Sequence, residues 1–224
     1  MVFTAQISTQ EINKYLANVN DVFNLNTFAD ILVTDVYPDL KEVAESSGAY
    51  KAYWHHIHRG LKGRYDNDRI DVYAVGDGCS PRAGVMFAMR TPYRVYSIDP
   101  NMKEKYLNTT VCNGTICSEW DGTQVFDQKI KCRVKRLSCH CCKIEKFDNR
   151  LYTPDVAIIV GVHCHVKLET ILETIDANRE IWAIMMPCCI DLLNPELRKN
   201  HIVHQYHDQG IPSPQNKIYI LRIK

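Results

Sequence analysis

Two glycines and two aspartates follow successive apolar segments in a pattern that suits nucleotide binding. The turn Val75-Gly76-Asp77-Gly78 ends one apolar segment, and Asp99-Pro100 ends the next. Glycines in such a turn accept positive φ angles and let the backbone approach a ligand. Free N–H groups at the start of a following helix favour a carboxylate or a phosphate. An acidic residue at the end of the second segment suits two ribose hydroxyls, so the spacing predicts a nucleotide-like cofactor at this turn.

Histidines and cysteines follow two further apolar segments and are candidates for catalysis. His163-Cys164-His165 comes just after the segment that ends at Gly161, and Cys188-Cys189 follows the next one. A histidine there can act as a general base, and a thiolate can act as a nucleophile. Each side chain could equally be a hydrogen-bonded wall residue or a small buried hydrophobe. Because the carboxyl ends of parallel strands share one edge, we expect these side chains to line one cleft beside Gly76.

Four other cysteines have a spacing that only partly resembles a zinc site. Cys112 and Cys117 are separated by about the distance usual for zinc ligands, but Cys139 and Cys141 are too close for a standard zinc knuckle. We therefore expect reduced thiols here and no bound metal.

Alternating strand and helix patterns predict the fold class. The segment 71–75, the glycine turn and the apolar stretch 83–89 indicate strand, turn and helix, with Pro81 near the helix start, where its missing N–H costs nothing. Further elements are expected as strands at 94–98, 130–137, 156–161, 181–186 and 217–223, and as a helix at 166–175. Strand 156–161 is continuously apolar, which is typical of a parallel strand buried on both faces. The sequence predicts an α/β, Rossmann-like, doubly wound and mostly parallel sheet with helices on both faces. One antiparallel strand, 217–223, is expected near the C-terminus, in an edge position.

The first part of the chain has a different character. Residues 1–65 are predicted to form a helical N-terminal extension on the core 70–224, and the two together make a single domain. Ser46-Ser47-Gly48 is expected to interrupt the helical pattern. In the histidine-rich run 54–59, only His55 and His58 share a helix face, so we expect an aromatic helix there and not a metal site.

Composition narrows the class of partner and the compartment. The formal net charge is +1, which provides no global basic field for nucleic acid. A local basic stretch, 129–136, is expected to be the solvated face of a strand, with a nucleic-acid contact as the alternative. Ten cysteines occur without a pattern that indicates a secretory signal or a membrane span. We therefore expect a cytoplasmic protein with reduced thiols and no membrane partner.

The glycine turn and the aspartate after the second strand resemble motifs of the class I S-adenosylmethionine-dependent methyltransferases. The segment 72–80 is similar to the first motif of that family, and 96–100 to the second. The resemblance implies S-adenosylmethionine as cofactor, with Gly76 and Gly78 facing its amino-acid end and Asp99 its ribose. The chain departs from the family pattern at Ala74, where an acidic residue is usual, and at Ser80, where a glycine is usual. The cofactor-binding residues that the resemblance implies are Val75, Gly76, Asp77, Gly78, Ser80, Asp99, Pro100 and Gly161.

A narrower resemblance concerns the catalytic candidates. The elements 160–165 and 186–189 resemble a methyltransferase subgroup that has a histidine element after the fourth strand and a Pro-Cys-Cys element after the fifth. That subgroup includes ribosomal RNA adenine dimethylase-like proteins. The resemblance implies that His163 and Cys188 face the substrate, and that the substrate is RNA or another macromolecule.

Two other functions remain open. A non-catalytic Rossmann-like module that binds RNA or a protein partner is favoured by Ala74 and Ser80. A nicotinamide-dependent dehydrogenase is less compatible, because Gly76 and Gly78 are followed by Gly84 and not by the usual third glycine of the dinucleotide motif.

Overall fold

The structure is a computed structural model of the chain. It describes residues 36–107, 110–112, 115–117, 136–148, 152–188, 193–211 and 213–224. Within these ranges, none of the helices combines the length and the apolar character that crossing a bilayer requires.

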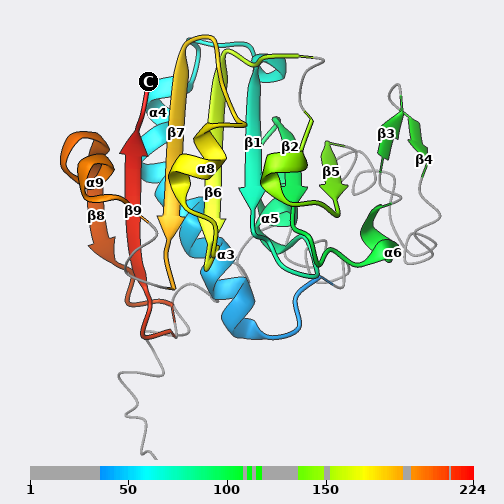
Figure 1. Cartoon of the computed structure of the whole chain (residues 1–224), viewed down its shortest axis with the longest axis horizontal. Helices are drawn as coiled ribbons and strands as arrows, with labels where there is room; N and C mark the ends of the chain where they lie inside the picture. Colours follow the sequence, from blue (N-terminus) through cyan, green and yellow to red (C-terminus); the bar gives the residue numbers. More distant parts are fainter. Residues whose placement is uncertain are drawn as a thin grey trace, which may run out of the picture.

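Seven strands form one mixed sheet in the order β5-β2-β1-β6-β7-β9-β8. Their bounds are β1 Ile70–Val75, β2 Arg94–Ile98, β5 Leu137–His140, β6 Val156–Val162, β7 Glu180–Met186, β8 Ile202–His207 and β9 Lys217–Arg222. The first five in the spatial order pair in parallel, and β9 is antiparallel to both of its neighbours. In Figure 1, the β9 arrow points upward while those of β7 and β8 point downward. The predicted Rossmann-like, mostly parallel sheet with one antiparallel strand near the C-terminus is confirmed.

Helices cover both faces of this sheet. α3 (Leu40–Tyr53) and α5 (Arg82–Arg90) lie behind it in Figure 1, and the short α8 (Leu168–Leu172) lies in front. Side chains of β1 alternate between two apolar clusters, so that Val72 and Ala74 pack with α3 and α5 while Tyr73 and Val75 pack with α8. The two-residue period of a strand produces this alternation, and burial of both faces explains why the strand is continuously apolar.

The remaining described elements are short. They are the π-helix η1 Trp54–His58, α4 Arg59–Leu61, the 3-10 turns η2 Asn67–Arg69 and η4 Ile144–Lys146, α6 Glu104–Leu107, the hairpin of β3 Thr110–Cys112 and β4 Thr115–Cys117, and α9 Pro195–His201. In η1 the rings of Trp54 and His58 stack with centroids 4.2 Å apart, in line with the aromatic helix expected there.

The expected break at Ser46-Ser47-Gly48 is wrong, because these residues lie in the middle of α3. All three are buried, and a Cβ atom on Gly48 would lie 2.7 Å from Cδ1 of Ile211. The residues are small because the loop after β8 packs closely against the helix at this point. This packing outweighs the weak helix propensity of serine and glycine. The part of the predicted helical extension before residue 36 lies outside the described residues.

The third predicted strand begins later than expected. The strand beside β2 is β5, and of the predicted range 130–137 only Arg136 and Leu137 are described. Arg136 lies in a turn, where its guanidinium donates to the backbone oxygens of Ala88 and Thr91. The inward positions of β5 are Leu137 and Cys139. Residues 130–135 of the predicted strand lie outside the described residues.

The expected edge position of the last strand is also wrong. β9 lies between β7 and β8, and β8 forms the edge. We did not predict β8 because its sequence does not alternate clearly: Val203, His204 and Gln205 are all exposed. A register irregularity between Ile202 and His204 accounts for this loss of alternation.

The tight contact between α5 and the sheet can be tested at Gly84. A Cβ atom there would lie 3.0 Å from both Leu137 Cδ1 and Ser97 Cβ. Gly84→Val should therefore lower the free energy of unfolding by about 1–3 kcal/mol through overpacking. Gly60→Ala is the matched control, because a Cβ atom on Gly60 would meet nothing within 4 Å. It should be neutral or raise stability by up to about 1 kcal/mol in urea unfolding. Equal losses in the two variants would contradict the packing argument.

Candidate functional site

The glycine turn after β1 has the backbone conformation that its sequence predicts. Gly76 and Gly78 have φ angles of 69° and 83°, which residues with a side chain rarely adopt. Gly76 has a second reason to lack a side chain, because a Cβ atom there would lie 2.7 Å from Sγ and 3.1 Å from Cα of Cys164. The turn is thus pressed against the loop that follows β6.

The carboxylate of Asp77 points into the protein. It accepts hydrogen bonds from the backbone N–H groups of Ala83 and Gly84, at 2.8 and 2.9 Å, and from the Ser97 hydroxyl at 2.7 Å. Burial raises the pKa of Asp77, and these donors act in the opposite direction. Asp77 therefore caps the first turn of α5, and its carboxylate is committed to that role.

Asp99 closes the same turn from the end of β2. Its carboxylate accepts from Gly78 N at 2.9 Å and from Asn101 N at 2.7 Å. A carboxylate offers about four acceptor positions, so two remain for a ligand. Asp99 therefore joins the glycine turn to β2 and can still bind hydroxyl groups.

A cavity of about 430 Å³ lies at the carboxyl ends of the strands. Its walls come from the ends of β1 and β2 and from the loops after β5 and β6. In the sheet, β2 and β5 lie on one side of β1, and β6 and β7 lie on the other side. The strand order therefore reverses between β1 and β6, and the cavity lies at this point. Open α/β sheets bind their ligands at this switch point. Of the predicted cofactor residues, Val75, Gly76, Asp99 and Pro100 line the cavity.

On the other side of Gly76, His163 is held by a buried glutamate. His163 has a φ angle of 51°, unusual for a residue with a side chain, and its Nε2 lies 2.7 Å from Oε1 of Glu45 in α3. Lys41 Nζ lies 3.1 Å from the same oxygen. Burial alone would raise the pKa of Glu45, but the hydrogen bonds and charges of His163 and Lys41 outweigh it and hold that pKa below its usual range. Glu45 is therefore ionised at neutral pH.

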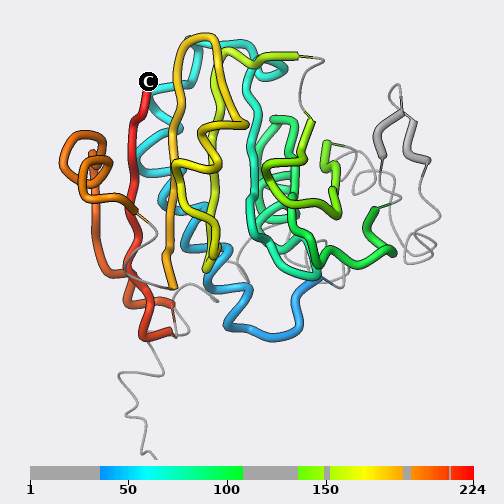
Figure 2. The backbone as a smooth tube through the Cα atoms, in the orientation of Figure 1, coloured from blue at the N-terminus to red at the C-terminus, as the bar shows by residue number. Residues whose placement is uncertain are grey.

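The start of α3 is tied to the glycine turn as well. Ser80 donates to the backbone oxygen of Val36 at 2.8 Å, and Tyr37 donates to that of Arg82 at 2.6 Å. Arg82, whose guanidinium lies against Gly78, forms an ion pair with Glu42. Figure 2 shows the described chain entering along the lower edge of the sheet, beside the ends of β1 and β6, before it turns up into α3. The start of α3 is therefore fixed beside the glycine turn.

Two cysteines in this region have different surroundings. Cys164 is 1% exposed, and burial is the main cause that raises its pKa to about 11. Cys188, after β7, is partly exposed, and its Sγ lies 3.5 Å from Nδ1 of His165. Cys164 is therefore a packing residue under Gly76, whereas Cys188 is accessible to reagents.

Gly78 donates its N–H to Asp99, and the other predicted site residues fall into three groups. The first lines the cavity. The second, Asp77, Ser80 and Gly161, lies inside the fold, where a Cβ atom on Gly161 would lie 2.8 Å from Met185 Cε. The third, His163 and Cys188, lies on the loops after β6 and β7, where Cys188 Sγ is 3.8 Å from the His163 backbone oxygen. Their roles toward a ligand stay predictions.

The other predicted cysteines differ in whether and where the structure describes them. Cys189 and the side chains of Cys112 and Cys117 lie outside what the structure describes. Cys139 is buried in β5, and Cys141 is exposed just after it. Sequence reasoning missed Glu45, whose only signal is its place beside Ser46-Ser47-Gly48, on a stretch of small residues that permits close approach.

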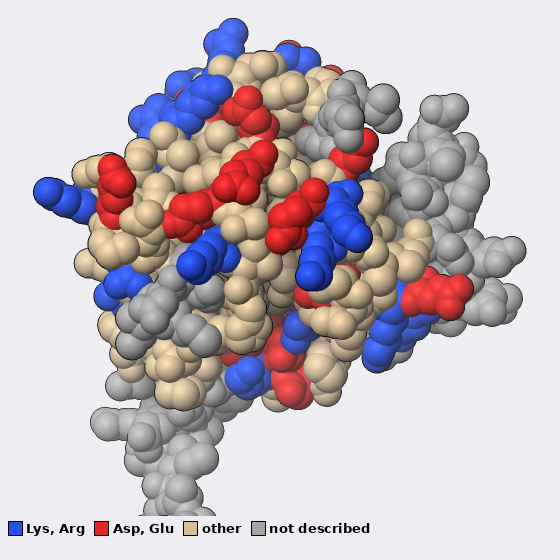
Figure 3. Space-filling model, viewed as in Figure 1, with Lys and Arg blue, Asp and Glu red and all other residues tan. Residues whose placement is uncertain are grey.

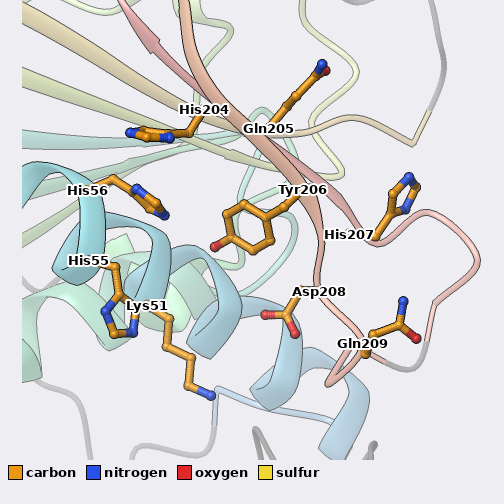
Figure 4. A pocket seen from close by; sticks show the side chains of 9 residues that line it. All are labelled: Lys51, His55, His56, His204, Gln205, Tyr206, His207, Asp208 and Gln209. Atoms are coloured by element: carbon orange, nitrogen blue, oxygen red, sulfur yellow. The ribbon is translucent and has the colours of Figure 1, made fainter.

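A second cavity, of about 520 Å³, lies between α3, η1 and the end of β8 (Figure 4). Its walls include Lys51, His55, His56, His204 and Tyr206. The rings of His56 and His204 face one another with centroids 4.2 Å apart and do not converge on one point. Across the described part of the chain, no group of three or more His, Cys, Asp or Glu side chains is arranged to hold a metal ion.

The face seen in Figure 3 carries acidic and basic side chains in alternation. Red and blue groups lie next to one another there, so neither sign dominates this face. Of the basic stretch 129–136, the described Arg136 is engaged with backbone oxygens near the end of α5. The described residues of this face therefore form no broad basic field of the kind that attracts a nucleic-acid backbone.

Comparisons with known proteins give structural similarity only. No family model matches the chain, and no curated protein matches it. Magnesium protoporphyrin IX methyltransferase from Synechocystis PCC 6803, with bound S-adenosylmethionine, is 14% identical over 98% of each chain, with a TM-score of 0.45. Precorrin-6y C5,15-methyltransferase from Geobacter metallireducens GS-15 is 9% identical over 84% of this chain and 88% of that chain, with a TM-score of 0.38. The plantazolicin methyltransferase BpumL, in complex with S-adenosylhomocysteine, is 13% identical over 92% of this chain and 68% of that chain, with a TM-score of 0.35.

The two cysteines should differ in their reaction with iodoacetamide. In the folded protein, Cys188 should be alkylated at least about tenfold faster than Cys164, because the thiolate is the reactive form and Cys164 is buried with a raised pKa. Peptide mass spectrometry over time measures both rates, with the exposed Cys141 as an internal reference. In urea the rates should converge. Alkylation of Cys164 as fast as that of Cys141 in the folded protein would contradict its packing role.

Proposed function

We propose that the chain is an S-adenosylmethionine-dependent methyltransferase. The observation that carries this proposal is the cavity at the switch point, where the positive-φ turn at Gly76 and the carboxylate of Asp99 lie side by side. The sheet order supports it, because the strand order reverses between β1 and β6, which places the Gly76 turn at the reversal point with Asp99 on the adjacent strand.

The residues of the cavity fit the nucleoside part of the cofactor. Its volume of about 430 Å³ lies within the range of small-molecule sites. Ile98, Ile144 and Val166 provide apolar walls for a purine ring, and Asp99 has acceptor positions for ribose hydroxyls. Gly76 contributes backbone and no side chain to the wall of the cavity.

The bound cofactor would supply an electrophilic methyl group on its sulfonium, and the protein binds and orients the reacting groups. His163 is the proposed acceptor of a proton from the methyl acceptor. In the neutral tautomer whose Nε2–H donates to Glu45, the lone pair that accepts the proton would be on Nδ1. Cys188 and His165, on the neighbouring loops, would line the acceptor side.

The acceptor that we propose, RNA or another macromolecule, rests on the sequence resemblance alone. The mixed charges in Figure 3 give no support to a long phosphate backbone on that face. An acceptor would enter from the loops after β6 and β7, because α3 closes the neighbouring side. A small-molecule acceptor fits these same features.

A non-catalytic binding module is the second candidate, and one observation favours it. The Arg82 guanidinium lies against Gly78 and pairs with Glu42, so side chains cover part of the glycine turn. A module of this kind would bind the cofactor weakly or not at all. Turnover with radiolabelled S-adenosylmethionine in the presence of cellular RNA and small-molecule fractions separates the two candidates.

Ligand binding at the cavity can be tested by thermal unfolding. S-adenosylhomocysteine should raise the Tm and NAD should not, because a ligand that binds only the folded state stabilises it, by about 2.7 kcal/mol at 100 times its Kd. Thr170→Phe, which places a ring in the cavity, should abolish the shift. Thr174→Phe, one turn further along and outside the cavity, is the matched control and should keep it. A shift with NAD and none with S-adenosylhomocysteine would refute the proposal.

A further inference from the structure

The amino-acid end of the proposed cofactor carries an ammonium group that needs an acceptor. The described carboxylates around the glycine turn are largely committed: Asp77 caps α5, and Glu42 pairs with Arg82. Asp99 faces the cavity on the nucleoside side. Glu145 also lines the cavity, whereas Glu45, on the α3 side of the turn, has an oxygen without a hydrogen-bond partner.

Glu45 is fully buried, with 0% of its surface exposed, and only one of its two oxygens has a partner. Oε1 takes both His163 and Lys41, while Oε2 has no hydrogen-bond partner. A buried carboxylate oxygen without a donor is costly, and buried polar atoms in proteins are nearly always satisfied. An unpartnered anionic oxygen beside a ligand site therefore calls for a donor from the ligand.

Two contacts place Glu45 across Gly76 from the cavity. Its partner His163 precedes Cys164, which touches Gly76. One turn earlier on the same helix face, Glu42 pairs with Arg82, which covers Gly78. Glu45 thus lies on the stretch of α3 that borders the whole turn. A ligand whose nucleoside occupies the cavity and whose chain passes Gly76 points its far end toward α3.

We propose that Glu45 Oε2 accepts the α-ammonium group of S-adenosylmethionine, which makes α3 part of the cofactor site. The proposal rests on the proposed function. Lys41 and His163 both act on Oε1, so they hold the carboxylate in place and leave Oε2 for the ligand. The ion pair forms in a buried environment, where a charge-assisted hydrogen bond is stronger than at the surface.

A purely structural role for Glu45, as the residue that holds His163, predicts a different result. Loss of that role would weaken every ligand of the site alike, because it would disturb the loop after β6. Loss of an ammonium acceptor weakens only ligands that carry the ammonium. The distinction calls for two ligands that differ in that one group.

The experiment is isothermal titration calorimetry with S-adenosylhomocysteine and with its deamino analogue, which keeps the carboxylate and lacks the amine. The wild type should bind S-adenosylhomocysteine at least about tenfold more tightly than the analogue. Glu45→Gln, which keeps the shape and an acceptor for His163, should remove this preference and leave the affinity for the analogue unchanged. Glu196→Gln, which changes an exposed glutamate of α9, is the matched control and should keep the preference.

A second variant covers the case in which Glu45→Gln does not fold. Lys41→Gln removes a half-exposed competing cation, so it should retain or increase the preference for the amine. Three results would overturn the assignment and leave the cofactor site in place. The first is equal binding of the two ligands by the wild type, the second is a preference for the amine that survives in Glu45→Gln, and the third is a loss of that preference in Lys41→Gln. Binding of neither ligand to the wild type would instead refute the proposed function.

Discussion

The buried carboxylate of Asp77 is the interaction on which the geometry of the cofactor edge depends. It receives two N–H groups from the start of α5 and a hydroxyl from β2, so one side chain fixes the helix, the glycine turn and the neighbouring strand. The carboxylate is costly to bury, and three donors offset that cost. Because Asp77 is committed inward, Asp99 becomes the acidic group at the rim of the cavity.

Contact between Gly76 and Cys164 gives the site two sides. The β1 turn and the loop after β6 touch at this point, with no room for a Cβ atom. The cavity with Asp99 lies on one side, and His163 with Glu45 lies on the other. Gly76 therefore serves packing against Cys164, and its positive-φ backbone also forms part of the cavity wall.

Much of the fold could be predicted because burial leaves a direct mark on the sequence. Four strands were predicted from apolar runs that end at a Gly or Asp residue or before Pro-Cys-Cys, namely β1, β2, β6 and β7. The alternation of such runs with helical patterns along the chain predicts a parallel sheet. The edge strand β8 left no such mark, since an exposed strand needs no apolar alternation. Ser46-Ser47-Gly48 was misinterpreted because helix propensity ignores tertiary contacts.

Glu45 could not have been found from motifs, since its significance arises only when α3 is packed on the sheet. The small residues beside it let the helix approach closely enough to bury a carboxylate against the loop after β6. The positive φ of His163 is a strained feature that persists only where surrounding contacts determine it, and the bond to Glu45 is one of them. A helix that only covered the sheet would need neither the buried charge nor the strained histidine. Their occurrence together, beside the glycine turn, is the physical reason to treat α3 as a working part of the site and not as an accessory to the core.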